Sequence, residues 1–511
     1  MDAESRRRWV PWIAAATAIL TAARYVPIAA EPLDASLASM NTSLTAKIVR
    51  CWQEVGFFRL HGIPQFGLLP TDPPEMVPYL RHPPCYPWLV NVAVSAVGLD
   101  EVGMRIVPIA FACLAGGLLA AFAGRLAGAR AAAAAGAVYL VSPMGLFFGW
   151  MANPESAVLA AILLTALLHE TFRDGPPRRY AWVLGAFFAG TLLDWPAYFA
   201  APALLVRELL EPRATRRLSR VIALFVAGAA SFAAMLALFT VWSGSFDLAK
   251  RGLRGSEWFS TEQNLVVWKE ADWFRNQVRF WSEFFSPPVA IVAWGSLPFL
   301  LRAAVRGDAL ARAALSLLVP AVLNVALFRL HAYEHPFWWY FGIPYAALAC
   351  VWVARAFERR RALALAILAA CVAWSVVRIV ELRREYANSD RPRLAAELNQ
   401  FAGARDGITT PTDFYSETFY LRAWPLPPIG DAGILRRLAE EKRQGRLLVD
   451  RVVCLVPQNP QGIPGLDFSA LVKELPSIGT VRRLDRDELK RVAPHYGEII
   501  GWTPLWILTI P

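Results

Sequence analysis

The chain has 511 residues, of which 56% are hydrophobic, and its net charge at pH 7 is +11. Soluble globular proteins are about 45–50% apolar, whereas several windows of about 20 residues in this chain carry almost no charge, which is the length that crosses the roughly 30 Å hydrocarbon layer of a membrane. The composition therefore excludes a soluble globular protein and predicts a multi-pass membrane protein.

The positive charge is confined to the apolar part of the chain. Residues 385–511 contain 16 basic and 16 acidic residues, so residues 1–384 hold 36 basic residues against 25 acidic ones. A basic excess limited to the membrane part is typical of cytoplasmic loops between membrane helices and argues against nucleic-acid binding. The six cysteines and six histidines show no metal-ligand spacing. No cofactor is predicted, and a divalent metal is not indicated.

The first hydrophobic segment begins at Trp9, after three consecutive arginines. This order predicts a retained membrane helix with a cytoplasmic N-terminus, and it places the next loop outside. That loop covers residues 31–87, opens with Glu31 and Asp34, and closes with the run Arg81-His82-Pro83-Pro84-Cys85-Tyr86-Pro87. Cys51 and Cys85 could form a disulfide there.

Apolar residues recur at helical spacing from Leu37 within this loop, which predicts an amphipathic helix along the membrane surface. Asp34 stands at the start of this helix. It is either the N-cap of the helix or a functional carboxylate, and both roles are compatible.

Residues 180–206 form an apolar run that is interrupted at Asp194, which predicts two short helices that meet there. An acid at such a break lines a cavity or caps a turn near the outer surface. Residues 88–98 are apolar but short, so they are either re-entrant or interfacial. In all, the sequence predicts about 11–12 hydrophobic segments.

A second long external loop, residues 243–286, is rich in aromatic residues. They either bind sugar rings or an isoprenoid chain or form an interfacial belt: Trp258, Trp268, Trp273, Phe274, Trp281, Phe284 and Phe285.

From residue 385 the hydropathy falls and turn signals appear. Strands are expected at 447–456 and 505–510, and helices at 435–446 and 485–492. The predicted fold is an all-α polytopic membrane bundle, residues 1–384, followed by a small soluble α/β domain, residues 385–511, on the external side.

The order of these features resembles the GT-C superfamily of integral-membrane glycosyltransferases. The shared features are a cytoplasmic N-terminus, one helix, an external loop that begins with an acid and an amphipathic helix, and a closing His-Pro-Pro run. Over residues 1–380 the chain is most similar to the bacterial branch of protein O-mannosyltransferases and the lipid A aminoarabinose transferase.

The resemblance implies a catalytic base at Asp34, with Glu31 a poor second choice, and a second acid at Glu155, which stands in Asn153-Pro154-Glu155. It places Arg81 and His82 near the phosphate of the carrier lipid. Many members carry two adjacent acids at the first position, whereas here Ala35 follows Asp34. This difference weakens the expectation of a metal.

The resemblance also covers two later positions. Tyr333 and His335 resemble an aromatic–histidine pair before a late helix, and the segment at Asp194 is similar to bacterial relatives without an assigned role. Simpler alternatives stay open: Glu155 is a favourable acid at a helix N-terminus, and Arg81 and His82 face lipid headgroups.

The predicted function is transfer of a hexose or pentose from a polyprenyl-phosphate donor to a hydroxyl of a glycan, lipid or protein acceptor. The reaction would take place with inversion, at the external face of the bacterial inner membrane. The alternatives are a lipid-linked-sugar transporter or flippase, which the Ala-, Leu- and Val-rich helix centres disfavour, and an inactive scaffold of the same fold.

Overall fold

The computed structural model divides the chain into two compact units: residues 1–31 with 80–385, called the membrane unit below, and residues 32–79 with 386–511, called the mixed unit. The structure describes residues 8–33, 36–69, 75–247, 249, 270–386, 391–409, 420–422, 424–425, 432–446, 449–457, 469–494 and 504–510.

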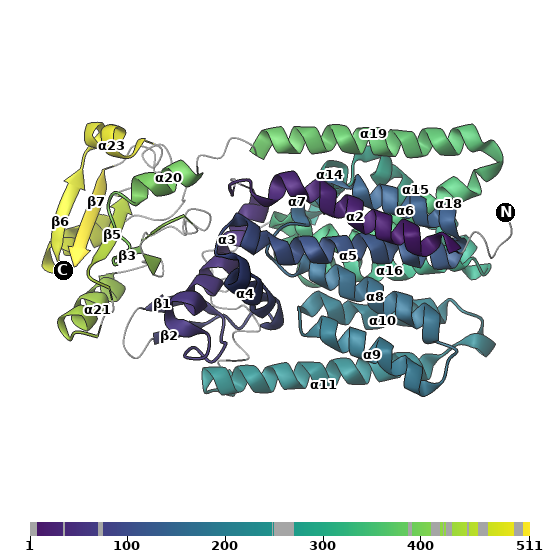
Figure 1. Cartoon of the computed structure of the whole chain (residues 1–511), viewed down its shortest axis with the longest axis horizontal. Coiled ribbons are helices and arrows are strands. Elements are labelled where there is room, and N and C mark those ends of the chain that lie inside the picture. The colour runs from purple at the N-terminus through teal and green to yellow at the C-terminus, as the bar shows by residue number, and fades with distance from the viewer. Residues whose placement is uncertain are drawn as a thin grey trace. The chain divides into compact units, whose positions relative to one another are not determined.

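The membrane unit consists of helices (Figure 1). Among the described residues, eight helices are long and apolar enough to cross a membrane: α2 (Val10–Ala29), α5 (Glu101–Ala127), α8 (Glu155–Phe172), α11 (Leu218–Ser243), α15 (Pro287–Val305), α16 (Ala309–Leu327), η5 with α18 (Pro336–Ala356), and α19 (Arg361–Tyr386). The chain is therefore a multi-pass membrane protein, as the composition predicts. α11 and α19 lie at opposite edges of this unit in Figure 1.

Shorter helices account for the rest of the predicted hydrophobic segments. The segment 88–98 belongs to α4 (Cys85–Val97), whose 13 residues span about 20 Å and do not cross the hydrocarbon layer. A break separates α6 (Ala129–Leu140) from α7 (Pro143–Phe148). Arg24 donates hydrogen bonds to the last carbonyls of α6, at Tyr139 and Leu140, and so satisfies backbone groups that the break exposes.

The predicted interruption at Asp194 is confirmed. α9 (Pro177–Thr191) ends before it, and a 3-10 turn, η2 (Trp195–Phe199), leads into α10 (Ala200–Leu209). The side chain of Asp194 caps this turn, because Oδ1 accepts a 2.8 Å hydrogen bond from the backbone N–H of Trp195.

Helix α14 (Glu270–Phe284) carries Trp273, Phe274, Trp281 and Phe284 of the second loop, and Phe285 follows it; Trp258 and Trp268 lie outside the described residues. Trp273, Trp281 and Phe284 are buried, and the Trp281 ring stacks on Phe285 at 4.0 Å. These side chains pack inside the unit and do not form an interfacial belt, whereas Phe274 is exposed.

The mixed unit contains a five-stranded sheet in the order β4-β3-β5-β7-β6, so the predicted α/β character is confirmed. Its strands are β3 (Gly407–Thr409), β4 (Trp424–Pro425), β5 (Val452–Pro457), β6 (Thr480–Leu484) and β7 (Leu505–Ile510). β3 runs parallel to β4 and β5, and β7 runs antiparallel to β5 and β6.

Strand β5 is apolar throughout because both of its faces are buried. Val452 and Cys454 pack on one side with α21 (Ala432–Arg443) and α22 (Ser469–Glu474). Val453 packs on the other side with α20 (Arg391–Leu398) and α23 (Arg486–Val492).

The first loop differs from the expected division, since residues 32–79 group with the C-terminal residues. This segment contains α3 (Leu37–Cys51), a π turn (Trp52–Gly56), and the antiparallel hairpin of β1 (Gln65–Leu69) and β2 (Glu75–Pro78). Arg50 of α3 donates hydrogen bonds to the carbonyls of Leu421 (2.6 Å) and Arg422 (2.9 Å). Such contacts over more than 370 residues are invisible in the hydropathy pattern.

The helix predicted from Leu37 is confirmed, but its N-cap is Ser36, whose hydroxyl accepts a 3.2 Å hydrogen bond from the N–H of Ser39. Asp34, the other candidate for the N-cap, lies outside the described residues. Cys51 and Cys85 are free thiols, so the disulfide considered for them is absent.

Candidate functional site

The basic run before α4 contacts the break between α9 and α10. His82 Nδ1 lies 2.7 Å from Asp194 Oδ1, and the Asp194 side chain is 7% exposed. The indole N–H of Trp195 donates a 2.5 Å hydrogen bond to the carbonyl of Arg81. Two consecutive residues of the break thus hold two consecutive residues of the basic run, 112 and 114 positions away in the sequence.

Glu155, the first residue of α8, is buried beside this pair and interacts electrostatically with both His82 and Asp194. Its Oε1 accepts a 3.0 Å hydrogen bond from Asn153 Nδ2. Within the described ranges, its Oε2 and the hydroxyl of Tyr86 are buried without a hydrogen-bond partner. An unsatisfied buried carboxylate oxygen is costly in a structure, and such a group commonly marks a site that a ligand or water completes.

A histidine of the turn before η5 (Pro336–Gly342) lies near the same cations. His331, in α17 (Arg329–Glu334), interacts electrostatically with Arg81 and His82. Its ring stacks on Trp338 with the centroids 5.4 Å apart, and it also stacks on His335 at 6.1 Å.

Two side chains of helix α14 form hydrogen bonds with the backbone of this turn. Asn276 Nδ2 donates to the carbonyl of Tyr333 at 3.2 Å, and Gln277 Nε2 donates to the carbonyl of Ala332 at 2.9 Å. The turn that carries His331 and His335 is therefore fixed by side chains of a neighbouring helix.

The three imidazoles differ in charge. Burial disfavours the imidazolium of His82, but the carboxylates of Asp194 and then Glu155 outweigh burial, so the pKa of His82 is raised above its usual 6.5. Burial lowers the pKa of His331 and of His335 to about 4, and at His331 the neighbouring cations add to this effect. Among these three imidazoles, the surroundings favour the positively charged form only at His82.

The structure brings together Arg81, His82, Glu155, Asp194 and the turn that contains Tyr333 and His335. Glu31 instead forms an ion pair with Arg383 of α19, and both side chains are half exposed. Asp34 lies outside the described residues. In the part of the chain that the structure describes, no group of three or more His, Cys, Asp or Glu side chains could hold a metal ion.

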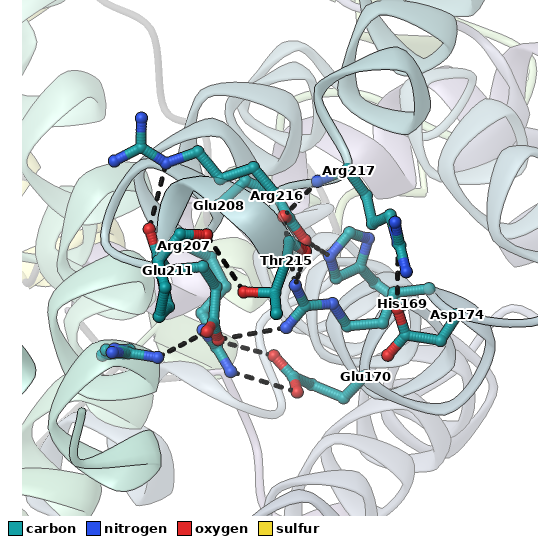
Figure 2. Close-up of polar contacts among 12 residues, drawn as sticks. His169, Glu170, Asp174, Arg207, Glu208, Glu211, Thr215, Arg216 and Arg217 are labelled. Carbon is teal, nitrogen blue, oxygen red and sulfur yellow. Dashed lines mark hydrogen bonds and ion pairs between the residues drawn. The ribbon is translucent and has the colours of Figure 1, made fainter.

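A second polar cluster, which the sequence did not predict, lies at the C-terminal end of α8, whereas Glu155 is at its N-terminal end. Figure 2 shows the residues of this cluster. Glu208 is fully buried and accepts hydrogen bonds from His169 Nε2 (3.0 Å), Arg173 Nη2 (3.2 Å) and the backbone N–H of Arg217 (2.7 Å). His169 follows Glu155 by 14 residues of α8, so about 21 Å along the helix axis separate this cluster from Glu155.

Glu211 extends the cluster to α16 and binds Arg173 at 3.0 Å and Arg312 at 2.5 Å, together with Arg207. Burial opposes the charge of Glu211, but these arginines outweigh burial and lower its pKa to about 2. In the sequence, this cluster is indicated by acids that stand next to arginines where an apolar run ends, as in Arg207-Glu208 and Glu211.

A family model described as dolichyl-phosphate-mannose-protein mannosyltransferase matches residues 81–242, which include Arg81, His82, Glu155 and Asp194. A comparison with curated protein sequences found no significant match.

Several solved structures are similar over most of the chain. ArnT from Cupriavidus metallidurans in the apo state is 15% identical, covers 98% of both chains and has a TM-score of 0.56. The structure of the same protein bound to undecaprenyl phosphate is also 15% identical over 98% of both chains, with a TM-score of 0.55. The apo oligosaccharyltransferase of Archaeoglobus fulgidus is 12% identical over 87% of this chain and 69% of its own, with a TM-score of 0.53. The chain therefore shares the fold of ArnT and of the archaeal oligosaccharyltransferase, and the resemblance predicted from the sequence is confirmed at the level of the fold.

Proposed function

We propose that this chain is a membrane glycosyltransferase that transfers a hexose or pentose from a polyprenyl-phosphate carrier to a hydroxyl of a glycan, lipid or protein acceptor. The proposal is supported by the likeness to ArnT over 98% of both chains, one structure of which holds undecaprenyl phosphate, and by the mannosyltransferase match at residues 81–242.

The observation that carries the proposal is the convergence of Arg81 and His82 with the acids Asp194 and Glu155. The leaving group of the reaction is a phosphate, and charge-assisted hydrogen bonds from fixed cations stabilise the charge that develops on it. The matched family segment contains all four residues.

In the proposed reaction, Asp34 takes the proton from the acceptor hydroxyl, and the hydroxyl oxygen forms a bond to the anomeric carbon. The bond from that carbon to the phosphate oxygen breaks, the carrier phosphate keeps the electron pair, and the anomeric configuration inverts. A positioned general base contributes about 10²–10⁴-fold. The role of Asp34 rests on its place in the sequence. Glu155 offers Oε2 to the acceptor or orients Arg81.

The proposed orientation puts the reaction at the external face of the bacterial inner membrane. The arginine-rich cluster of Arg173, Arg207 and Arg312 lies at the opposite end of α8 from Glu155. Arginines concentrate on the cytoplasmic side, so the end with Glu155 is assigned to the external side, together with residues 385–511.

The test is sugar transfer by the purified protein in lipid vesicles that contain a panel of polyprenyl-phosphate sugars. Release of carrier phosphate by the wild type, reduced at least about 100-fold in Asp34→Asn, is the expected result. Asp174→Asn is the matched control, because Asp174 forms an exposed ion pair. A parallel reaction with a chelator tests metal dependence.

Other outcomes would contradict the proposal. Movement of labelled carrier across the vesicle membrane without phosphate release would favour a transporter. Full turnover by Asp34→Asn would remove that residue as the base. No turnover and no carrier binding with any donor would favour the inactive scaffold.

A further inference from the structure

The carboxylate of Asp194 has two hydrogen-bond partners in the candidate site, but the proposed reaction gives it no chemical role. Its side chain is 7% exposed, caps η2 through the N–H of Trp195, and lies 2.7 Å from His82 Nδ1. η2 packs against α8, α9, α10 and α16 of the same unit, so the carboxylate is held by several elements.

We propose that Asp194 is a positioning residue: its carboxylate accepts the Nδ1–H of His82 and keeps this imidazole as an oriented imidazolium that binds the carrier phosphate. This inference rests on the proposed function. In the same arrangement, the indole of Trp195 holds the carbonyl of Arg81, so the break in the membrane segment sets the orientation of the basic run.

The geometry distinguishes Asp194 from Glu155. Glu155 interacts with His82 only electrostatically, whereas Asp194 makes a direct hydrogen bond that fixes the ring. A carboxylate that binds one ring nitrogen of a histidine fixes the tautomer of the ring and the direction in which the other ring nitrogen points. Asp194 therefore acts through His82 and need not contact substrate.

The charges that face His82 determine the pH dependence. Burial and Arg81 oppose the imidazolium of His82, whereas Asp194 and then Glu155 favour it. His331 also faces His82, but its pKa of about 4 leaves it uncharged between about pH 5 and 9. Removing the charge of Asp194 leaves the opposing groups in place, so the pKa of His82 falls. Since phosphate binding needs the imidazolium, the variant should lose affinity at a lower pH than the wild type.

The experiment measures binding of undecaprenyl phosphate to the purified full-length protein in nanodiscs between about pH 5 and 9, with undecaprenol as the phosphate-free control. For Asp194→Asn we expect the midpoint of the affinity loss to move down by about one pH unit and the affinity near pH 7.5 to fall about 10-fold. Asp194→Glu should restore part of the affinity. Binding of undecaprenol should not change.

Three further variants separate positioning from general damage. His82→Gln should remove the pH dependence, and the double variant with Asp194→Asn should bind no worse than His82→Gln alone, because the two residues act as one unit. Trp195→Phe should weaken binding without moving the pH midpoint. Glu208 forms a similar histidine–carboxylate pair with His169. Glu208→Gln removes that carboxylate, and it should leave the affinity for the carrier and the pH midpoint of binding unchanged.

An unchanged midpoint in Asp194→Asn with intact binding would overturn the role of Asp194 and leave the proposed function standing. A loss of affinity in the double variant equal to the sum of the two single losses would also overturn the role of Asp194. If the wild type binds undecaprenyl phosphate no better than undecaprenol, the proposed function itself fails, and this inference fails with it. Thermal unfolding of each variant identifies the folded samples, and if Asp194→Asn does not fold, Asp194→Glu and the His82 variant decide the question.

Discussion

Removal of the Glu208 carboxylate should strongly destabilise the membrane unit. This carboxylate is fully buried and accepts three hydrogen bonds, two of them from the side chains of His169 and Arg173. In Glu208→Ala the Arg173 cation loses one of its buried acidic partners, and water cannot easily replace it. Breaking a buried ion pair costs about 3–5 kcal/mol, so we expect that loss in the free energy of unfolding. Glu208→Gln keeps the shape and one acceptor, and it should cost about 1–3 kcal/mol.

The assay is denaturant unfolding in mixed micelles, followed by tryptophan fluorescence. Asp174→Asn is the matched control, because the Asp174–Arg217 pair is 66% and 44% exposed and such pairs contribute about 0–1 kcal/mol. A loss below about 1 kcal/mol in Glu208→Ala, or an equal loss in Asp174→Asn, would refute the argument that burial determines the cost. If Glu208→Ala does not accumulate, the ranking of Glu208→Gln against the control still tests the reasoning.

Two further predictions concern packing and pH. A Cβ on Gly149 would lie 2.1 Å from the hydroxyl of Tyr25, whereas a Cβ on Gly185 of α9 meets nothing within 4 Å. Gly149→Ala should therefore lower the free energy of unfolding by about 1–3 kcal/mol, and Gly185→Ala should leave it unchanged or raise it by up to about 1 kcal/mol; equal effects would contradict the close approach of Tyr25 to Gly149. The pKa values of His331 and His335 lie at about 4, below the ordinary 6.5, so the unfolded chain takes up protons first as the pH falls from 6.5 to 4. Stability should fall across that window, by at most about 1.4 kcal/mol per pH unit for each histidine, and the variant with Asn at both positions should have a flatter profile of unfolding midpoint against pH.

The sequence alone was sufficient wherever a local pattern defines the structure. Long uncharged windows identified the membrane helices, and the apolar run that ends at Val456 identified strand β5, whose burial on both faces came from the structure. The interruption at Asp194 was also visible, because an acid inside an apolar run requires a break or a partner. Hydropathy and periodicity depend only on residues that are close in the chain, and these features are of that kind.

The tertiary structure decided which distant residues meet. The sequence indicated that Asp194 lines a cavity or caps a turn, but only packing shows that it contacts His82. The network around Glu208 joins α8, α10 and α16, and its acids and arginines could each have been solvated loop residues. The joining of α3 to the C-terminal residues likewise depends on hydrogen bonds from Arg50 across 371 positions. Folding removes both groups of such a pair from water, and each group then forms its hydrogen bond with the other. This condition exists only in the folded chain.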